Sequence, residues 1–403
     1  MTEKQLNPGE LKIDILCSGL RISDSARTAL EGIPLPSSRA GLGSGLELVI
    51  PGPLRDVWVN APVAERFVAQ TPYYLEAAGG SQRIRDTRNG FTYPARLAPR
   101  PGWYEARTSS RLRMGSVATL QGTCLSILIG DRCRFWKATQ NCVFCSTGLD
   151  SSWEEDRPAG VDDVVETALA ARAESGITFV LLQSGYHGAG GLRDAFPYLR
   201  ALKEKAGLIV GVQFTPERDL ALYDEALSLG ADHLSFSFEF YNPEYFRRYL
   251  PGKAEAIGRP QFFRALEHCA RRMGKGRVSG QIIAGIEPLA DTLHAIEYIG
   301  CVGAYPLVCI FRPLLGTALE DHPPPAFRDM QKVFRHVYRT CRTHSLPIDV
   351  APNIYWSLSL QPEDTLYLAR DAPADRIYQS WIRLLKLLLR PYFYCRMHRF
   401  GVR

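Results

Sequence analysis

The sequence predicts an α/β fold, in which a partial (βα)6 TIM-type barrel follows a strand- and turn-rich N-terminal extension and precedes a helical C-terminal region. Strand-like and helix-like segments alternate over six units between about residues 120 and 325, and such alternation is typical of a parallel sheet covered by helices. Right-handed crossovers curl this sheet into a barrel, and six units instead of eight predict a partial one. The length of 403 residues also exceeds one ordinary domain. We therefore expect three parts, at residues 1–115, 116–325 and 326–403.

The individual elements follow from two patterns, because short apolar runs indicate strands and apolar residues at helical spacing indicate helices. The expected strands span residues 124–130, 177–183, 208–214, 233–239, 277–286 and 305–312. The expected helices between them span residues 161–175, 192–206, 220–229, 261–273 and 289–299.

The flanking parts have a different character. The first part is rich in Gly and Pro, and short strands are expected at 46–50 and 57–60. It also contains a GxGxG pattern at Gly41, Gly43 and Gly45. Because this pattern lacks the strand–helix context of a nucleotide site, we expect a turn there. The last part predicts a helix at 326–345 and a basic amphipathic helix at 377–390. We expect the second helix to cap an open barrel edge instead of lying on a membrane surface.

Composition excludes several classes of protein. A hydrophobic share of 46% and a charged share of 22% are ordinary for a globular protein and exclude a mainly disordered or collagen-like chain. The net charge of +6 is mild, so we expect neither a nucleic-acid nor a membrane partner. No apolar run approaches the roughly 18 residues of a spanning helix, and the N-terminus lacks a secretory pattern. Ten cysteines then predict a cytoplasmic protein whose thiols serve metals or catalysis.

The most specific pattern is Cys133-x8-Cys142-x2-Cys145, directly after the first strand of the alternating series. Functional groups of such folds lie on the loops at the carboxyl ends of the strands. Three thiolates could hold three irons of a [4Fe-4S] cluster and leave the fourth iron open. From the spacing alone, a zinc ion with three protein ligands and a Cys142–Cys145 redox pair remain alternatives.

This loop, its position after the first barrel strand and Phe144 before the last cysteine resemble the radical S-adenosylmethionine (radical SAM) superfamily. That family usually has gaps of three and two residues, whereas the first gap here is eight. The extra closure entropy is only about 1 kcal/mol, and the inserted Phe135, Trp136 and Lys137 could shield a cluster or shape the mouth of the pocket. The N-terminal part and the long gap also look similar to a radical SAM subgroup encoded beside nitrilases.

The resemblance implies S-adenosylmethionine as a second cofactor, bound at the ends of the later strands. Ser184-Gly185 stands where the family has Gly-Gly-Glu, and the run from Glu239 resembles the strand of aromatic-amino-acid lyases and biotin-synthase-like enzymes whose glutamate bonds the ribose. Gly285 lies in a partial match to the adenine-packing motif. The cofactor-binding residues implied in this way are Phe144, Ser184, Gly185, Gln213, Glu239, Arg259 and Gly285.

The function implied by the resemblance is radical enzymology on a small polar substrate. The family cleaves S-adenosylmethionine to a 5′-deoxyadenosyl radical, with electrons from a donor such as flavodoxin or ferredoxin. Substrate contacts at the same face are expected from Tyr186, His187, Tyr241 and Arg312. Lyase, rearrangement, cyclisation and sulfur-insertion reactions all remain open. Cys124 and Cys309 are expected to be buried free thiols, although biotin-synthase-like enzymes place an auxiliary cluster inside the barrel.

Overall fold

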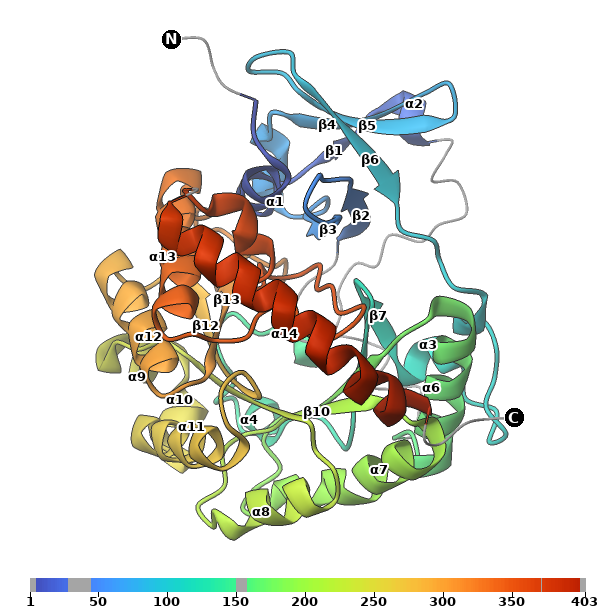
Figure 1. Ribbon diagram of the computed structural model, residues 1–403, viewed down its shortest axis with the longest axis vertical. Coiled ribbons are helices and arrows are strands. Elements are labelled where there is room, and N and C mark those ends of the chain that lie inside the picture. Colours follow the sequence, from blue (N-terminus) through green and yellow to red (C-terminus); the bar gives the residue numbers. More distant parts are fainter. Residues whose placement is uncertain (1–4, 28–44, 150–157, 371, 399–403) are drawn as a thin grey trace.

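The computed structural model describes residues 5–27, 45–149, 158–370 and 372–398, and it places two sheets one above the other (Figure 1). Gly41 and Gly43 of the GxGxG lie outside these ranges. The lower sheet has seven strands in the order β13-β12-β11-β10-β9-β8-β7, and the upper has six in the order β1-β4-β5-β6-β2-β3.

The lower sheet contains every strand expected from the alternating pattern. Its strands are β7 (Thr119–Gln121), β8 (Cys124–Leu128), β9 (Phe179–Gln183), β10 (Ile209–Gln213), β11 (His233–Glu239), β12 (Val278–Ala284) and β13 (Tyr305–Ile310). From β8 to β13 the neighbours are parallel and follow the chain order, whereas β7 pairs antiparallel with β8 at the edge. The α/β class is thereby confirmed, and a partial TIM-type barrel stays our interpretation of this open sheet.

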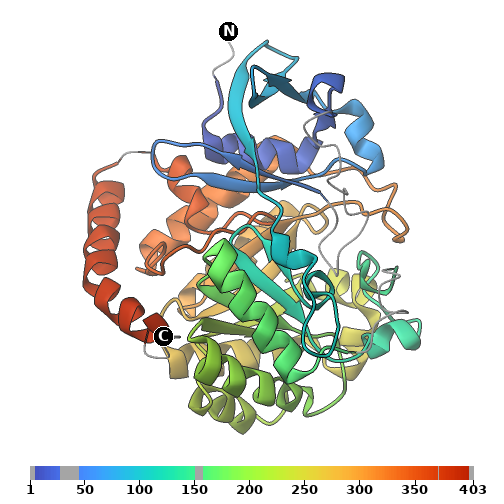
Figure 2. The same ribbon diagram turned by 90° about the vertical axis from the view of Figure 1, so that its right-hand side faces the viewer.

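Helices cover the outer face of the lower sheet (Figures 1 and 2). The helices of this part of the chain are α3 (Met114–Val117), α4 (Arg134–Lys137), α6 (Val161–Ser175), α7 (Phe196–Ala201), α8 (Ala221–Ser228), α9 (Pro243–Tyr249), α10 (Pro251–Ala256), α11 (Arg259–Met273) and α12 (Leu289–Cys301), of which α4 and α10 lie at the carboxyl ends of the strands. Each interstrand helix expected from the sequence is present except the one at 192–206, which is not one continuous α-helix. Gly191–Ala195 is a 3-10 helix and Leu202–Ala206 a π-helical turn.

The irregularity of the 192–206 segment has local causes. Pro197 stands in the first turn of α7, where its missing N–H costs no helical hydrogen bond. The π turn ends at Gly207, which adopts the left-handed conformation that glycine accepts without strain. Within that turn, Lys203 is held by Asp232 at 2.7 Å, so the segment is anchored to the beginning of β11.

The N-terminal part forms the upper sheet and also a buried helix that the sequence pattern did not predict. Its elements are α1 (Pro8–Ser18), β1 (Arg21–Ile22), α2 (Asp24–Arg27), β2 (Leu46–Ile50), β3 (Val57–Ala61), β4 (Tyr73–Ala78), β5 (Ser81–Asp86) and β6 (Thr92–Leu97). Helix α1 begins with a capping box between Asn7 and Glu10 and has Pro8 in its first turn. The sequence signal for α1 was therefore its capping residues, which the spacing of apolar residues does not reveal.

Two buried polar contacts tie the N-terminal part to the rest of the chain. Lys12 of α1 donates to Asp364 at 2.7 Å, with both side chains buried. Arg312, just after β13, donates to the side-chain oxygen of Asn60 at 3.0 Å and to its carbonyl at 2.5 Å. The position of the loop after β13 therefore depends on residues of β3.

The C-terminal part contains two long helices, α13 (Phe327–Thr343) and α14 (Pro373–His398), joined by a segment with a short 3-10 helix at Asp364–Leu368. Helix α14 crosses the front of the molecule in Figure 1 and stands along one side in Figure 2. Lys386 and Arg396 attach it to Asp349 and Asp232. Its exposed large apolar side chains are Ile377, Leu384, Leu387, Leu388, Tyr392 and Tyr394.

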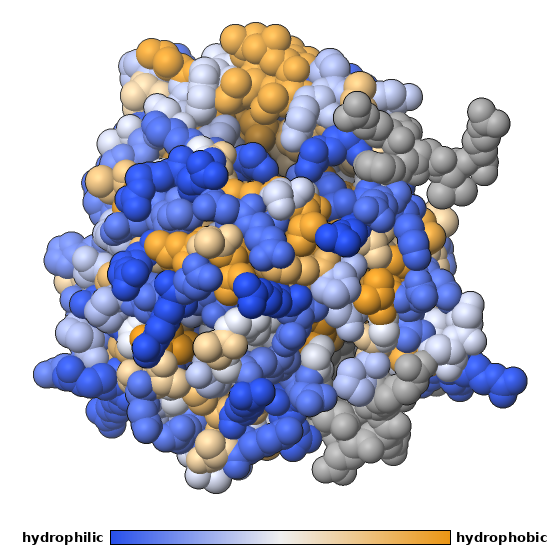
Figure 3. All heavy atoms as spheres, turned by 90° about the horizontal axis from the view of Figure 1, so that it is seen from below, coloured by the Kyte–Doolittle hydropathy of each residue, from blue (hydrophilic) through white to orange (hydrophobic). Residues whose placement is uncertain are grey.

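Most of the face seen from below is hydrophilic, with apolar patches between charged side chains (Figure 3). Across the described ranges, no helix combines the length and the apolar character that crossing a bilayer would require.

Candidate active site

The three cysteines line one cavity of about 230 Å³ at the carboxyl ends of the parallel strands. Ten of the residues expected from the sequence contribute to its wall: Cys133, Cys142, Phe144, Cys145, Ser184, Gly185, Tyr186, Gln213, Glu239 and Arg312. They come from the cysteine loop and from the ends of β9, β10, β11 and β13, far apart in sequence. The expected edge of the sheet is therefore where these side chains meet.

The eight-residue gap between the first two cysteines is folded, not loose. It forms the single turn of α4 and presents Phe135, which stacks on Tyr186 with ring centroids 4.4 Å apart. Gly252 of α10 allows the close approach of Phe135, because any Cβ there would collide with the ring at 2.6 Å. Gln140 donates to Glu255 at 2.6 Å. The insertion thus packs on α10 and fixes the place of Cys133.

Two of the cysteine sulfurs make hydrogen bonds with neighbouring groups. The amide of Tyr186 donates to Cys133 Sγ at 3.3 Å, and Cys145 Sγ donates to Thr147 Oγ1 at 3.2 Å. Gly185 is required beside Cys133, since a Cβ at that position would lie 2.8 Å from the Cys133 Cα. N–H···S bonds and closely packed glycine are the means by which proteins orient and tune sulfur ligands of iron.

The donor set fits a cluster better than a single ion. Among the described residues, no three His, Cys, Asp or Glu side chains are grouped closely enough to hold one metal ion. Zinc requires its ligand atoms about 2.3 Å from one centre, whereas a cubane distributes its cysteines over separate irons. Trp136, in the same wall, has a buried Nε1 without a hydrogen-bond partner in the described part of the chain. A buried donor of this kind favours a site that receives a further group.

Cys142 lies in a buried environment within the cavity wall. Burial raises the pKa of the Cys142 thiol, and the nearby Lys253 only partly opposes that shift.

Glu239 ends β11 in an unusual conformation. Its φ is 55°, in the left-handed region that a residue with a side chain seldom occupies, and a bulge precedes it. Both carboxylate oxygens accept from Lys253, at 2.6 and 2.8 Å. Burial raises the pKa of Glu239, and Lys253 opposes this shift. Strained backbone at a strand end is typical of functional sites.

Lys253 is a site residue that the sequence analysis missed. It reaches the cavity from α10, a helix of six residues that was not expected, and it also donates to the carbonyl of Ser237 at 2.8 Å. Pro251 in the first turn was the available local signal for that helix.

A layer of amides forms the floor of the cavity. The Gln213 amide donates to Ser237 at 2.7 Å and to Gln281 at 3.1 Å, and Gln281 donates to Cys309 Sγ at 3.4 Å. Gln213 is therefore engaged with neighbouring strands in this structure. Cys124 is a buried free thiol that faces the carbonyl of Tyr355 at 3.8 Å, whereas Cys309 is free but only partly buried.

Four of the site residues expected from the sequence do not belong to this cavity wall: His187, Tyr241, Arg259 and Gly285. His187 contacts the carbonyl of Asp131 at 3.0 Å, and Arg259 donates to the carbonyl of Tyr241 at 2.7 Å while lying over its ring. Gly285 has a φ of 107°, and a Cβ there would collide with Pro325. Contacts of these four residues with substrate or cofactor stay predictions. So does the proposed clamp role of Arg312, which is bound to Asn60.

Glu287 anchors the loop after β11 through hydrogen bonds to its backbone. One of its carboxylate oxygens accepts the backbone N–H groups of Tyr241 and Asn242, each at 2.9 Å. Burial raises the pKa of Glu287 to about 7, although these two backbone hydrogen bonds lower it. The residue stands in the partial match to the adenine-packing motif, and its position here is structural support for the Tyr241 loop.

The raised pKa of Glu287 predicts a pH-dependent stability. A folded-state pKa above the usual 4.5 means that the stabilising contribution is full below pH 4.5 and is lost as the pH rises through about 7. Glu287→Gln retains an acceptor for both N–H groups and does not ionise. We therefore compare the free energies of unfolding of the variant and the natural chain in urea titrations. The value for the variant minus that for the natural chain should increase by on the order of 3 kcal/mol between pH 4.5 and pH 8.

The matched control is Glu174→Gln. Glu174 is exposed and also accepts two backbone N–H groups, from Gly102 at 2.6 Å and Trp103 at 3.0 Å. It measures what the same change of residue does where the two N–H contacts are at the surface. A Glu287→Gln difference that changes with pH no more than the Glu174→Gln difference does would contradict the prediction.

Comparison with known proteins gives one limited similarity. No protein-family model matches the chain. Over 111 residues the chain is 27% identical to bacteriochlorophyllide c C-7(1)-hydroxylase of Chlorobaculum limnaeum. The matched region covers 27% of this chain and 28% of that protein, so it spans less than a third of either. By its name, that relative is an enzyme.

Proposed function

We propose that the chain is a radical SAM enzyme in which Cys133, Cys142 and Cys145 hold a [4Fe-4S] cluster. The observation that carries the proposal is their meeting in one cavity with Glu239 and the end of β9, at the carboxyl ends of a parallel sheet. When bound, the cluster and S-adenosylmethionine supply a 5′-deoxyadenosyl radical that takes hydrogen from the substrate. The distant hydroxylase is compatible with this class, and our proposal does not adopt its substrate.

The roles of the chain's own groups follow from their positions. The Tyr186 amide keeps Cys133 oriented, and the stacked Phe135 and Tyr186 rings exclude water from that side of the cavity. Glu239 offers two acceptors suited to the ribose hydroxyls, and Lys253 donates to both oxygens and so fixes the position of that carboxylate. Ser184 adds a hydroxyl at the end of β9.

The remaining parts of the proposal concern the reaction. A small polar substrate would occupy the space between the cysteine loop and β13, and a flavodoxin- or ferredoxin-like donor would deliver electrons. Lyase, rearrangement, cyclisation and sulfur-insertion outcomes all begin with the same hydrogen abstraction, and we propose no choice among them.

The test is anaerobic purification and reconstitution of the full chain. We expect about four irons and four sulfides per chain and, after reduction, a paramagnetic signal that changes when S-adenosylmethionine is added. Reduced protein should form 5′-deoxyadenosine, measured by mass spectrometry. Reconstituted protein that binds zinc and no iron, or that never forms 5′-deoxyadenosine, would overturn the proposal.

A further inference from the structure

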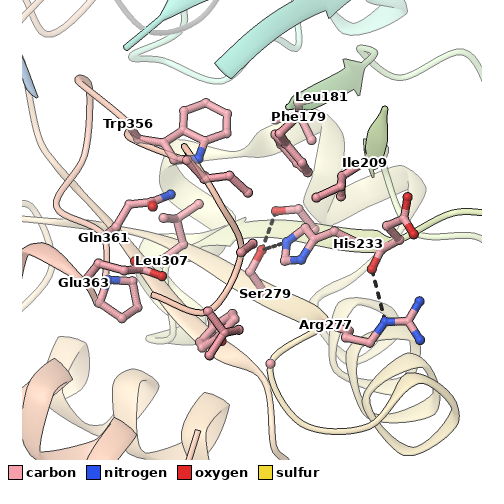
Figure 4. Close-up of a pocket in the computed structure, with 18 of the residues that line it drawn as sticks. Phe179, Leu181, Ile209, His233, Arg277, Ser279, Leu307, Trp356, Gln361 and Glu363 are labelled. Atoms are coloured by element: carbon pink, nitrogen blue, oxygen red, sulfur yellow. Dashed lines mark hydrogen bonds between the residues drawn. The ribbon is translucent and has the colours of Figure 1, made fainter. Parts of the chain in front are cut away.

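A second cavity of about 400 Å³ lies at the opposite, amino ends of the parallel strands (Figure 4). The first residues of β9, β10, β11 and β13 contribute to its wall, and the segment between α13 and α14 closes it. Leu389, Tyr392 and Phe393 of α14 complete the lining. This cavity has no part in the function proposed above.

The wall of this amino-end cavity is mainly apolar. In Figure 4, Trp356 lies on one side and Phe179, Leu181 and Ile209 on the other. Gly211 shapes this wall, because a Cβ there would approach the Phe179 ring to 2.6 Å. The glycine leaves room for the Phe179 ring beside β10.

Three interior polar side chains, those of His233, Ser279 and Ser235, form one chain of hydrogen bonds. The His233 ring contacts Ser279 Oγ at 3.0 Å, and Ser279 Oγ donates to Ser235 Oγ at 2.9 Å (Figure 4). Burial lowers the pKa of His233 to about 4, so its imidazole is neutral at physiological pH. Imidazole and hydroxyl groups can each donate to or accept from a ligand hydroxyl or carbonyl.

The described wall of this cavity has three carboxylates, and each of them has a partner. Glu363 accepts the backbone N–H of Asp349 at 3.0 Å. Asp232 is paired with Lys203 at 2.7 Å and with Arg396 at 2.5 Å. Asp349 is paired with Arg55 at 2.8 Å and Lys386 at 2.9 Å. Two further rim cations, Lys275 and Arg277, are exposed and donate to backbone carbonyls.

A partition separates the two cavities. The residues common to both walls are Gln183, Gln213, Gln281, Cys309 and Leu358. The amide hydrogen bonds described above connect three of them across β10, β12 and β13. A molecule in the amino-end cavity would therefore contact this layer, including Cys309, and not Cys133, Cys142 or Cys145.

We propose that the amino-end cavity binds an uncharged, largely apolar small molecule that carries a hydroxyl or carbonyl group. Its volume is in the range of small-molecule sites, about 300–1,000 Å³, which are typically apolar with few polar groups. The aromatic and aliphatic wall takes the apolar body, and His233 or Ser279 takes the polar group. This site does not depend on what the three cysteines hold.

The test is a fluorescence titration of the full chain with the uncharged probe N-phenyl-1-naphthylamine. We expect saturable binding of one probe per chain. Leu307→Trp fills the cavity from β13 and should weaken binding at least about tenfold, because the probe loses its contact area. The matched control Leu54→Trp makes the same change at a residue that is 57% exposed and outside the cavity, and its binding should equal that of the natural chain.

Two further variants complete the test, one as a second way of filling the cavity and one as a surface control. Ala351→Trp fills the same cavity from the closing segment, so it replaces Leu307→Trp if circular dichroism shows that the latter misfolds. Leu388→Ser changes the outer face of α14, where Leu388 is 65% exposed, and should leave binding intact. Equal binding by both cavity-filling variants, absence of saturable binding, or loss confined to Leu388→Ser would overturn the proposal.

Discussion

Replacing Cys142 with alanine should abolish 5′-deoxyadenosine formation and leave the fold intact. Within the described cavity wall, the cysteine loop beside α4 and α10 contributes three cysteines, and each proposed ligand would serve one iron of the cubane. Two remaining thiolates cannot complete that set. We expect the reconstituted variant to lose the cluster's absorbance and its paramagnetic signal, with product formation below detection by mass spectrometry.

The control for this variant is Cys301→Ala. Cys301 is an exposed free cysteine at the end of α12, so its replacement removes a thiol without touching the cavity. Its iron content and product formation should equal those of the natural chain. A Cys142→Ala protein that keeps the full cluster signal and forms 5′-deoxyadenosine would contradict the assignment of this residue as a ligand.

Gly185→Ala should damage the same centre without removing a ligand. A Cβ at this position would collide with the Cys133 side chain and lie 2.8 Å from its Cα, so Cys133 or the end of β9 must move. Displacing a positioned group by about 1 Å can cost about 100-fold in rate. We therefore expect product formation to fall at least about tenfold, with a lower iron content after reconstitution.

Gly191→Ala is the matched control on the same stretch of chain. A Cβ there would lie 3.4 Å from the Cβ of His187, an ordinary contact, and Gly191 has no positive φ. Its activity and iron content should stay close to those of the natural chain. If Gly185→Ala retained full activity and full iron content, the close packing of Gly185 on Cys133 would not be needed for the proposed centre, which would contradict the prediction.

Much of the lower sheet was predictable from sequence because each strand carries its own apolar run and each helix its own spacing. The strand at His233–Glu239 and the helix at Val161–Ser175 have the predicted bounds. Helix α1 was not predicted, since it is buried on most sides and shows little amphipathic contrast. Helices α9 and α10 are short, and their proline and asparagine starts were the available signals.

The cavity was predictable only in part. The cysteine spacing marked the loop, and strand order brought Gln213 and Glu239 to the same edge. Lys253 could not be found in this way, because its approach depends on how α10 packs against the long cysteine gap. Arg259 has the charge for a carboxylate clamp, yet its contacts with Tyr241 and Phe263 are set by tertiary packing that no local pattern reveals.

The anchoring of Arg312 on Asn60 has a practical consequence for anyone who wishes to work with a shorter version of this protein. Excising the first hundred residues would strip a buried guanidinium of its partners and leave Asp364 without Lys12. We therefore expect a shortened protein that keeps only the alternating half of the chain to fail to fold on its own.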